Sequence, residues 1–284
     1  MANTPTVAAD LAPAISVDYV SKLHENINSL NKVLTAAEMQ QIPAGSTVNI
    51  YKTEADALEA QVAENALINA TKVSRALAGS ITMTLKKYRK QTSAESIQKV
   101  GYDIAINNTD KKIIKKVQGA IRDRFYTALN TGTGTASGTN LQTALADLWG
   151  KLAEYYEDMD ATPIYFINPT DVSNYLGTAN ISTQTAFGFN YIEGFLGLGD
   201  AIISPKITAT HPIATAKENL IGYYSPVTGD VGTAFGLTSD ESGLVGMKHY
   251  TGDNSASFET LILECVAFAP EFADGVFKAT ISAT

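Results

Sequence analysis

The segment Thr109–Gly132, TDKKIIKKVQGAIRDRFYTALNTG, carries the clearest helical pattern in the chain. Asn108 or Thr109 can cap its start, and Gly132 is placed to stop it. About twenty residues at 1.5 Å each span roughly 30 Å. The pattern predicts one long surface helix with a single buried stripe. The stripe consists of Ile114, Val117, Ile121, Phe125 and Ala128.

Positive charge gathers around this helix, although the 284-residue chain has a formal net charge of −8. Residues 72–124 hold 13 Lys and Arg against 4 Asp and Glu, a balance of +9, so the remainder carries −17. Such a chain suits binding to a polyanion or association between copies. The helix dipole disfavours cations in the first two turns by about a few tenths of a kcal/mol each, which indicates a partner for the lysines there. They are Lys111, Lys112, Lys115 and Lys116.

A strand is predicted just upstream, because residues 81–90 (ITMTLKKYRK) alternate with a period of two. One face changes from apolar to basic halfway along, which predicts a hairpin that leaves its own core. Residues 46–54 (STVNIYKTE) supply the opposing strand. Residues 54–71 between them allow a short helix, with Thr53 and Asp56 as a capping box, or an irregular loop. An isolated ribbon is marginally stable, so this hairpin should pack on the body or on another molecule.

The remaining segments predict a mixed fold. Residues 1–45 read as an extended arm with a helical stripe in its second half, and residues 131–140 (TGTGTASGTN) as a flexible hinge. A second amphipathic helix follows over residues 141–155, capped by Asn140. Next come a buried strand at residues 164–167, a turn and a short helix. Short strands broken by Gly, Pro and Asp complete the chain, in an order unlike alternating β and α units.

The sequence contains no recognisable catalytic or metal-binding motif. Cys265 is the single cysteine and lies in an apolar run, so we expect a buried strand residue. His24, His211 and His249 are scattered without metal-ligand spacing. We therefore predict no catalytic residues, no metal, no cofactor and no enzymatic activity. The N-terminus has neither a secretory signal pattern nor an apolar run long enough for a membrane span.

The order of these features resembles the major capsid protein of tailed bacteriophages, the Hong Kong 97-type shell fold. Three passages carry the resemblance: residues 85–129, from LKKYRK to the end of the long helix; residues 158–176, DMDATPIYFINPTDVSNYL; and residues 240–281, from DESGLVGMKHY to FKATI. The resemblance implies an α+β fold with five parts. They are an N-terminal arm (1–45), an extended hairpin or E-loop (46–108), a peripheral domain with the spine helix (109–138), an axial domain (139–250) and return strands (251–284).

The resemblance also implies a function. Copies would assemble as pentamers and hexamers into the icosahedral head of a tailed phage, in the bacterial host cytoplasm, and become part of the virion. Double-stranded DNA would lie against the inner face without sequence-specific contacts. Portal and other head proteins would be partners, and a separate scaffolding protein is expected because the chain has no room for a scaffolding segment. No membrane is involved.

Two hypotheses follow for the basic residues. In the first, they make electrostatic contacts between subunits. In the second, segment 72–124 binds single-stranded nucleic acid, with Tyr88 stacking on bases. The first is favoured because cations on both faces of the strand do not form one polyanion groove. The intersubunit residues predicted are Lys86, Lys87, Arg89, Lys90, Lys111, Lys112, Lys115 and Lys116.

Overall fold

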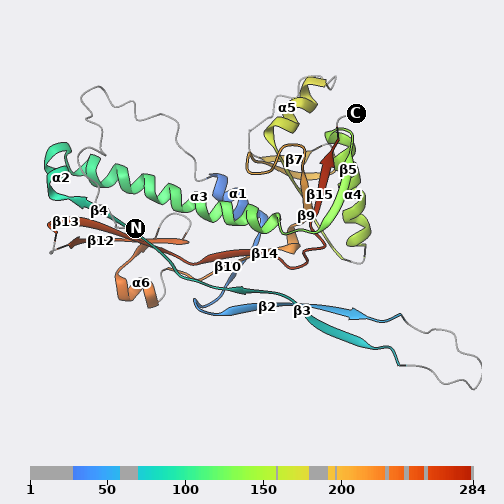
Figure 1. Ribbon diagram of the computed structural model, residues 1–284, viewed down its shortest axis with the longest axis horizontal. Coiled ribbons are helices and arrows are strands. Elements are labelled where there is room, and N and C mark those ends of the chain that lie inside the picture. Colours follow the sequence, from blue (N-terminus) through green and yellow to red (C-terminus); the bar gives the residue numbers. More distant parts are fainter. Residues whose placement is uncertain are drawn as a thin grey trace, which may run out of the picture.

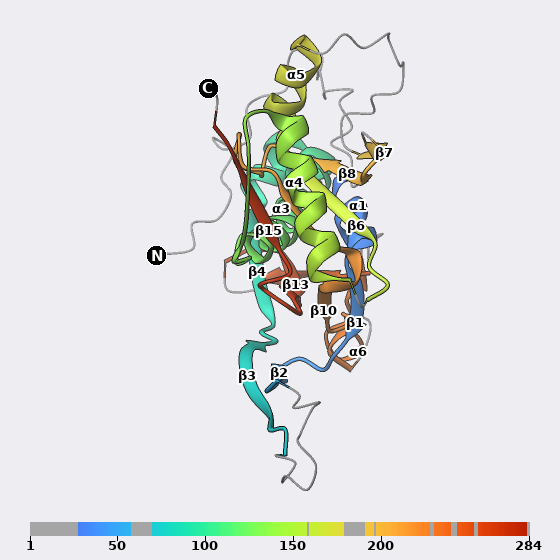
Figure 2. The same cartoon turned by 90° about the vertical axis from the view of Figure 1, so that its right-hand side faces the viewer.

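The molecule is elongated, with two lobes joined along its long axis and a two-stranded hairpin projecting from the body (Figures 1 and 2). The computed structural model describes residues 28–57, 70–157, 159–178, 191–195, 197–227, 230–239, 243–252 and 255–282. Its helices are α1 (Asn28–Ala36), α2 (Ala94–Val100), α3 (Thr109–Leu129), α4 (Leu141–Tyr155), α5 (Pro169–Thr178) and α6 (Asp230–Phe235), together with a π-helix (Asp103–Asn108) and a 3-10 turn (Lys217–Asn219).

One lobe is built on a six-stranded mixed sheet. Its central strand, β6 (Pro163–Ile167), is apolar on both faces because both are covered. Tyr165 and Ile167 pack in the cluster formed with α4, whereas Ile164 and Phe166 pack in the cluster formed with α1 and α3. The strand order is β5 (Gly134–Gly138), β15 (Phe277–Ile281), β9 (Ile213–Ala216), β6, β8 (Gly199–Ile203) and β7 (Tyr191–Phe195). The predicted buried strand is thus confirmed.

The other lobe lies under the long helix α3 and contains two smaller sheets (Figure 1). The first is antiparallel, in the order β11 (Thr238–Ser239), β12 (Val245–Gly252), β13 (Ser257–Glu264) and β4 (Lys86–Ser93). The second has the order β1 (Glu38–Gln41), β10 (Leu220–Tyr224) and β14 (Val266–Pro270). Strands β13 and β14 are consecutive, so one apolar run, interrupted at the buried Cys265, serves both sheets. The prediction of a buried cysteine is confirmed.

Helix α3 matches the predicted helix, and its stripe is buried at Val117, Ile121 and Phe125. The helix begins at Thr109 as predicted, but the predicted cap at its start and the stop at Gly132 are wrong. The π-helix runs directly into α3, and the Thr109 hydroxyl donates to the carbonyl oxygen of Ala105 at 2.7 Å instead of capping a free end. The helical segment therefore begins upstream of the lysines, which removes the dipole argument for their position. At the other end, α3 stops at Leu129, before Gly132.

Strand 81–90 is not continuous, contrary to the prediction. The hairpin consists of β2 (Thr47–Ala55) and β3 (Val73–Thr82), and the chain then turns into the body before β4 begins at Lys86. The cause is Met83, which is 1% exposed and packs in a cluster with Tyr223 and Cys265. The LKKYRK segment therefore lies in the body sheet, paired with β13, and not on the hairpin.

The helix alternative for residues 54–71 is wrong at its start, because Thr53 lies within β2. Residues 58–69 lie outside the described part of the chain. The N-terminal helical stripe is confirmed where it is described, since Leu30 and Val33 of α1 are buried. Its beginning, with His24, lies outside the described residues. Helix α4 is confirmed with its cap: the Asn140 side chain accepts from the amide of Thr143 at 2.9 Å.

The predicted hinge is a strand. β5 pairs in parallel with β15, and its glycines are needed for close packing rather than for flexibility. A Cβ atom at Gly134 would lie 2.5 Å from the Phe277 ring, and one at Gly138 would lie 2.3 Å from the backbone nitrogen of Ala144. The predicted hinge is therefore a packed edge strand of the six-stranded sheet.

Replacing these glycines tests that interpretation. Gly138→Ala should lower the free energy of unfolding by about 1–3 kcal/mol, because backbone atoms must move to make room. Gly150→Ala is the matched control: this exposed glycine in α4 has open space around it, so alanine should stabilise by about 0.5–1 kcal/mol. Equilibrium unfolding in guanidinium measures both. A flexible hinge would instead leave Gly138→Ala as harmless as the control.

Candidate assembly surface

A buried charge cluster lies between α3 and the body sheet. Asp110 of α3 is 3% exposed and accepts from Lys90 Nζ at 2.6 Å and from Thr260 Oγ1 at 2.9 Å. His249 Nε2 lies 2.6 Å from its other carboxylate oxygen. Lys90 is itself only 7% exposed. The predicted intersubunit role of Lys90 is therefore wrong, because its ammonium group is used inside the subunit.

Two further cations of the basic segment pair with distant carboxylates of β13. Arg89 donates two hydrogen bonds to Glu259, from Nε at 2.6 Å and from Nη2 at 2.5 Å. These bonds hold the pKa of the buried Glu259 below its usual value. Arg124 binds Glu264 through both terminal nitrogens, and the Tyr88 hydroxyl donates to the same carboxylate at 3.1 Å.

These pairs weaken the hypothesis of single-stranded nucleic-acid binding, because they engage residues that such binding would use. Tyr88 is partly buried and bonded to Glu264, so it is not an open stacking platform. Arg89 is 43% exposed on its side chain but is engaged by Glu259. The cations at Lys90 and Arg124 are likewise paired within the subunit. Only part of the positive charge that the sequence concentrates in residues 72–124 is therefore left for a partner.

The other predicted lysines lie at the surface of the same lobe. Lys87 on β4 is exposed, as are three lysines of α3, whereas Lys86 and Lys115 are partly covered. The structure does not bring these lysines together with the hairpin. Their contact with a neighbouring subunit remains a prediction. The three exposed lysines of α3 are Lys111, Lys112 and Lys116.

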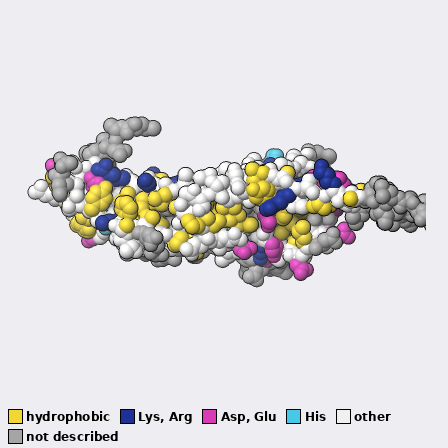
Figure 3. Space-filling model, turned by 90° about the horizontal axis from the view of Figure 1, so that it is seen from below, with side chains coloured by type: hydrophobic (Ala, Val, Ile, Leu, Met, Phe, Trp, Pro, Cys, Tyr) yellow, Lys and Arg dark blue, Asp and Glu magenta, His cyan; other side chains and the backbone are white. Residues whose placement is uncertain are grey.

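The hairpin exposes large apolar side chains that the sequence analysis did not select. Tyr51, Val73 and Leu77 are 42%, 62% and 57% exposed. The guanidinium carbon of Arg75 lies 4.0 Å from the centre of the Tyr51 ring. Seen from the side on which the hairpin lies, hydrophobic side chains are exposed along much of the molecule (Figure 3). The alternation of residues 73–77 places Val73 and Leu77 on one side of the strand and is the signal for this surface in the sequence.

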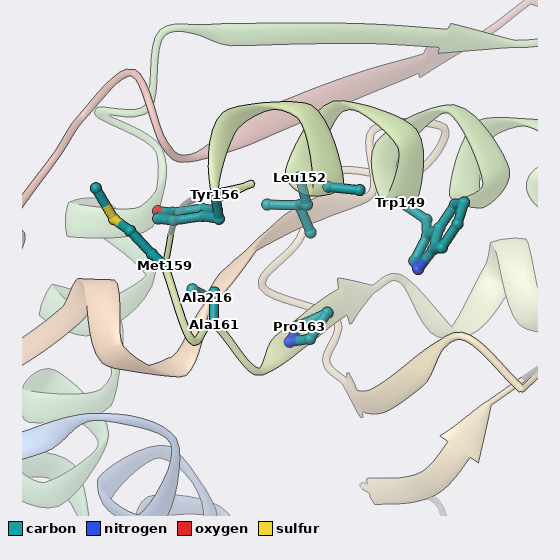
Figure 4. A pocket seen from close by; sticks show the side chains of 8 residues that line it. Trp149, Leu152, Tyr156, Met159, Ala161, Pro163 and Ala216 are labelled. Atoms are coloured by element: carbon teal, nitrogen blue, oxygen red, sulfur yellow. The ribbon is translucent and has the colours of Figure 1, made fainter.

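An apolar pocket lies against α4 in the lobe that contains the six-stranded sheet (Figure 4). Its volume is about 170 Å³, and Trp149, Met159 and Pro163 are among its lining residues. Tyr156 also lines the pocket. Its hydroxyl group donates to the carbonyl oxygen of Gly275 at 3.2 Å, and burial raises the pKa of this phenol to about 12. The pocket thus offers apolar surface rather than reactive groups.

Within the described ranges, no three potential metal ligands come together. Of the two histidines in those ranges, His249 is held by Asp110, and the Nδ1 atom of His211 lies within 3.1 Å of the Thr210 hydroxyl. None of the described helices is long and apolar enough to cross a membrane. The features that stand out at the surface are therefore the hairpin and the lysines, which suit contacts with a macromolecule.

The chain is similar to known proteins in structure but not detectably in sequence. No protein-family model and no curated protein sequence matches the chain. The capsid of an empty GTA particle matches with a TM-score of 0.67 at 12% identity, covering 96% of each chain. The capsid of Myoviridae phage XM1 matches with a TM-score of 0.63 at 8% identity, covering 89% of this chain and 92% of that one. The capsid of cyanophage P-SCSP1u matches with a TM-score of 0.56 at 10% identity, covering 88% and 87%.

These likenesses identify the architecture. A mixed α+β body with a long helix spanning two lobes and a protruding hairpin places the chain in the class of viral shell folds. More narrowly, it has the Hong Kong 97-type fold of phage capsids, as the resemblance in sequence implied. At such low identity the comparison establishes the fold, and the division into arm, E-loop, peripheral and axial domains stays a prediction.

The buried charge cluster can be tested in the isolated subunit. Asp110→Asn should lower the free energy of unfolding by about 3–5 kcal/mol, because it leaves the ammonium of Lys90 buried without its counter-charge. The matched control is Asp123→Asn, since Asp123 pairs with Lys206 at the surface, at 3.1 Å; it should cost about 0–1 kcal/mol. Urea titration followed by circular dichroism gives both values. Equal effects of the two changes would show that the cluster is no stronger than a surface pair.

Proposed function

We propose that this chain is a structural capsid subunit that self-assembles as pentamers and hexamers into an icosahedral phage head around double-stranded DNA. The observation that carries the proposal is the match of almost the entire chain, 96% of each partner, to a capsid subunit. The hairpin packs on the subunit's own core only at its base and leaves Tyr51, Val73 and Leu77 exposed farther out. The proposed role is structural rather than enzymatic, and the subunit would be part of the virion.

The physical properties of the hairpin support assembly. A two-stranded ribbon in water is marginally stable, and this one exposes Tyr51, Val73 and Leu77. Burying such side chains contributes roughly 25 cal/mol per Å² of apolar surface removed from water. Stable protein interfaces usually bury about 1,600 Å² in total, and an extended hairpin lying on a neighbour supplies a large share of such an area. A partner surface is therefore the natural environment for this element.

Partners beyond the subunit itself belong to the same proposal. A separate scaffolding protein, a portal and other head proteins would act during assembly in the bacterial cytoplasm. DNA would contact the inner face through charge without reading its sequence. The exposed and partly exposed cations of β4 and α3 are proposed as electrostatic contacts between subunits, since most of the negative charge lies elsewhere in the chain. The residues concerned are Lys86, Lys87, Arg89, Lys111, Lys112, Lys115 and Lys116.

Sedimentation and negative-stain microscopy of the purified chain test the proposal directly. We expect rings, sheets, tubes or closed shells as the protein concentration rises. A protein that stays monomeric at high concentration, and that binds single-stranded oligonucleotides with a steep salt dependence, would overturn the proposal in favour of nucleic-acid binding.

Charge reversal tests the lysines separately. Lys111, Lys112 and Lys116 changed together to Glu should abolish assembled particles, because attraction to acidic patches on a neighbour becomes repulsion. The circular dichroism spectrum of the subunit should not change, since all three side chains are exposed. Lys151→Glu and Lys278→Glu together provide a control with charge changes elsewhere on the surface. Normal particles from the triple variant would remove these lysines from the interface.

A further inference from the structure

The two faces of the hairpin differ in chemistry, and the strand register assigns each residue to a face. Tyr51 lies opposite Leu77, Thr53 opposite Arg75 and Ala55 opposite Val73. Because alternate residues of a strand point to opposite sides, these six share one face. The intervening pairs, Lys52 with Ala76 and Glu54 with Ser74, share the other.

The second of these faces is turned toward the subunit's own body. At the base of the hairpin, Val48 packs beside the buried cluster that contains Met83 and Cys265. Lys52 lies on the same side of β2 as Val48, and its ammonium donates to Asp274 at 2.9 Å. Asp274 also accepts a hydrogen bond from Tyr155 of α4, at 2.8 Å. The face that carries Lys52 and Glu54 is therefore the inner face, and the face that carries Tyr51 and Leu77 is the outer one.

A β-bulge creates this arrangement. Ile50 pairs with Gly79, but the next residue, Tyr51, pairs with Leu77, so Ala78 is an extra residue in β3. Without it, Leu77 would continue the alternation of Ile81 and Gly79 and would point to the inner face. The bulge moves Leu77 and the residues beyond it to the outer face, next to Tyr51. Bulges of this kind re-aim side chains, and they are seldom accidental.

The composition of the two faces is the opposite of what a hairpin in solvent needs. The outer face holds three exposed apolar residues, Tyr51, Val73 and Leu77, with Arg75 stacked over the Tyr51 ring. The inner face holds the ion pair of Lys52 and Glu54 at 3.2 Å. The hairpin projects from the body (Figure 2), and the exposure of Tyr51, Val73 and Leu77 shows that their own subunit does not cover the outer face.

We propose that the outer face of the hairpin, formed by Tyr51, Val73, Arg75 and Leu77, is the surface that binds a second copy of this chain. The inference rests on the proposed function and deepens it, because it selects one face and excludes the other. A second copy is favoured by charge: Arg75 lies in the segment with a balance of +9, and the rest of the chain carries −17. The receiving surface is expected to be apolar, with a carboxylate near Arg75.

Paired substitutions on one strand test the choice of face. Val73→Asp with Leu77→Asp should abolish particles in sedimentation while the subunit keeps its circular dichroism spectrum. Ser74→Asp with Ala76→Asp adds the same charge to the same strand on the inner face and should leave assembly intact. Particles from both pairs, or from neither, would overturn the assignment of the face. A wild-type chain that never assembles would instead overturn the proposed function.

Thiol labelling provides a readout that does not depend on loss of assembly. The natural cysteine, Cys265, is fully buried and its thiol pKa is raised by burial, so maleimide should report on introduced cysteines. Leu77→Cys should label in the free subunit and lose labelling by roughly tenfold or more in particles, since interface cores exclude water. Ala76→Cys should label in both states. Equal protection of the two positions, or protection of Ala76→Cys alone, would contradict the proposal.

Discussion

The packing of α3 against two separate cores is the constraint on which the rest of the molecule depends. Val117 and Ile121 lie in the core beneath the helix, whereas Phe125 and Leu129 lie in the core of the six-stranded sheet. A helix in isolation is only marginally stable, so this packing is what maintains it. Because the 21-residue helix is continuous, the two lobes keep a fixed relation to each other. The Phe125 ring, 5.6 Å from that of Phe166, locks the far end of the helix onto the central strand.

Asp110 determines how the sheet of β4, β12 and β13 lies against this helix. Its carboxylate bonds Lys90 of β4 and Thr260 of β13 and lies 2.6 Å from His249 of β12, so one side chain contacts all three strands. Buried ionic groups often add little net stability, but they penalise every arrangement that leaves a charge unpaired. A slip of β4 by one residue would turn Lys90 to the opposite face. The cluster therefore fixes register. The same chemistry explains why cations so concentrated in sequence are not all available at the surface.

The sequence predicted those elements whose pattern is local. The stripe of α3, the Asn140 cap of α4 and the apolar run of β6 can each be read within twenty residues, and the structure confirms them. Predictions failed where the conformation or burial of a residue depends on contacts with residues far away in the sequence. Arg89 and Glu259 are 170 positions apart, and the packing of Gly138 depends on how the neighbouring helix approaches. The charge pattern left polyanion binding and self-association both open, and it could not show that Lys90 is buried against Asp110.

The hairpin combines an exposed apolar face with features that limit pairing between strands of different molecules. Exposed strands invite pairing with other chains, and proteins usually discourage it with charge and irregularity. Here the bulge at Ala78 interrupts the ladder, the pair of Lys52 and Glu54 makes one face polar, and Arg75 covers part of the Tyr51 ring. None of these devices removes apolar area from the outer face permanently. If the proposed contact forms, a carboxylate of the neighbour near Arg75 would compete with the Tyr51 ring for the guanidinium group. The features that limit strand pairing and the side chains of the proposed contact surface therefore lie on the same short stretch of the hairpin.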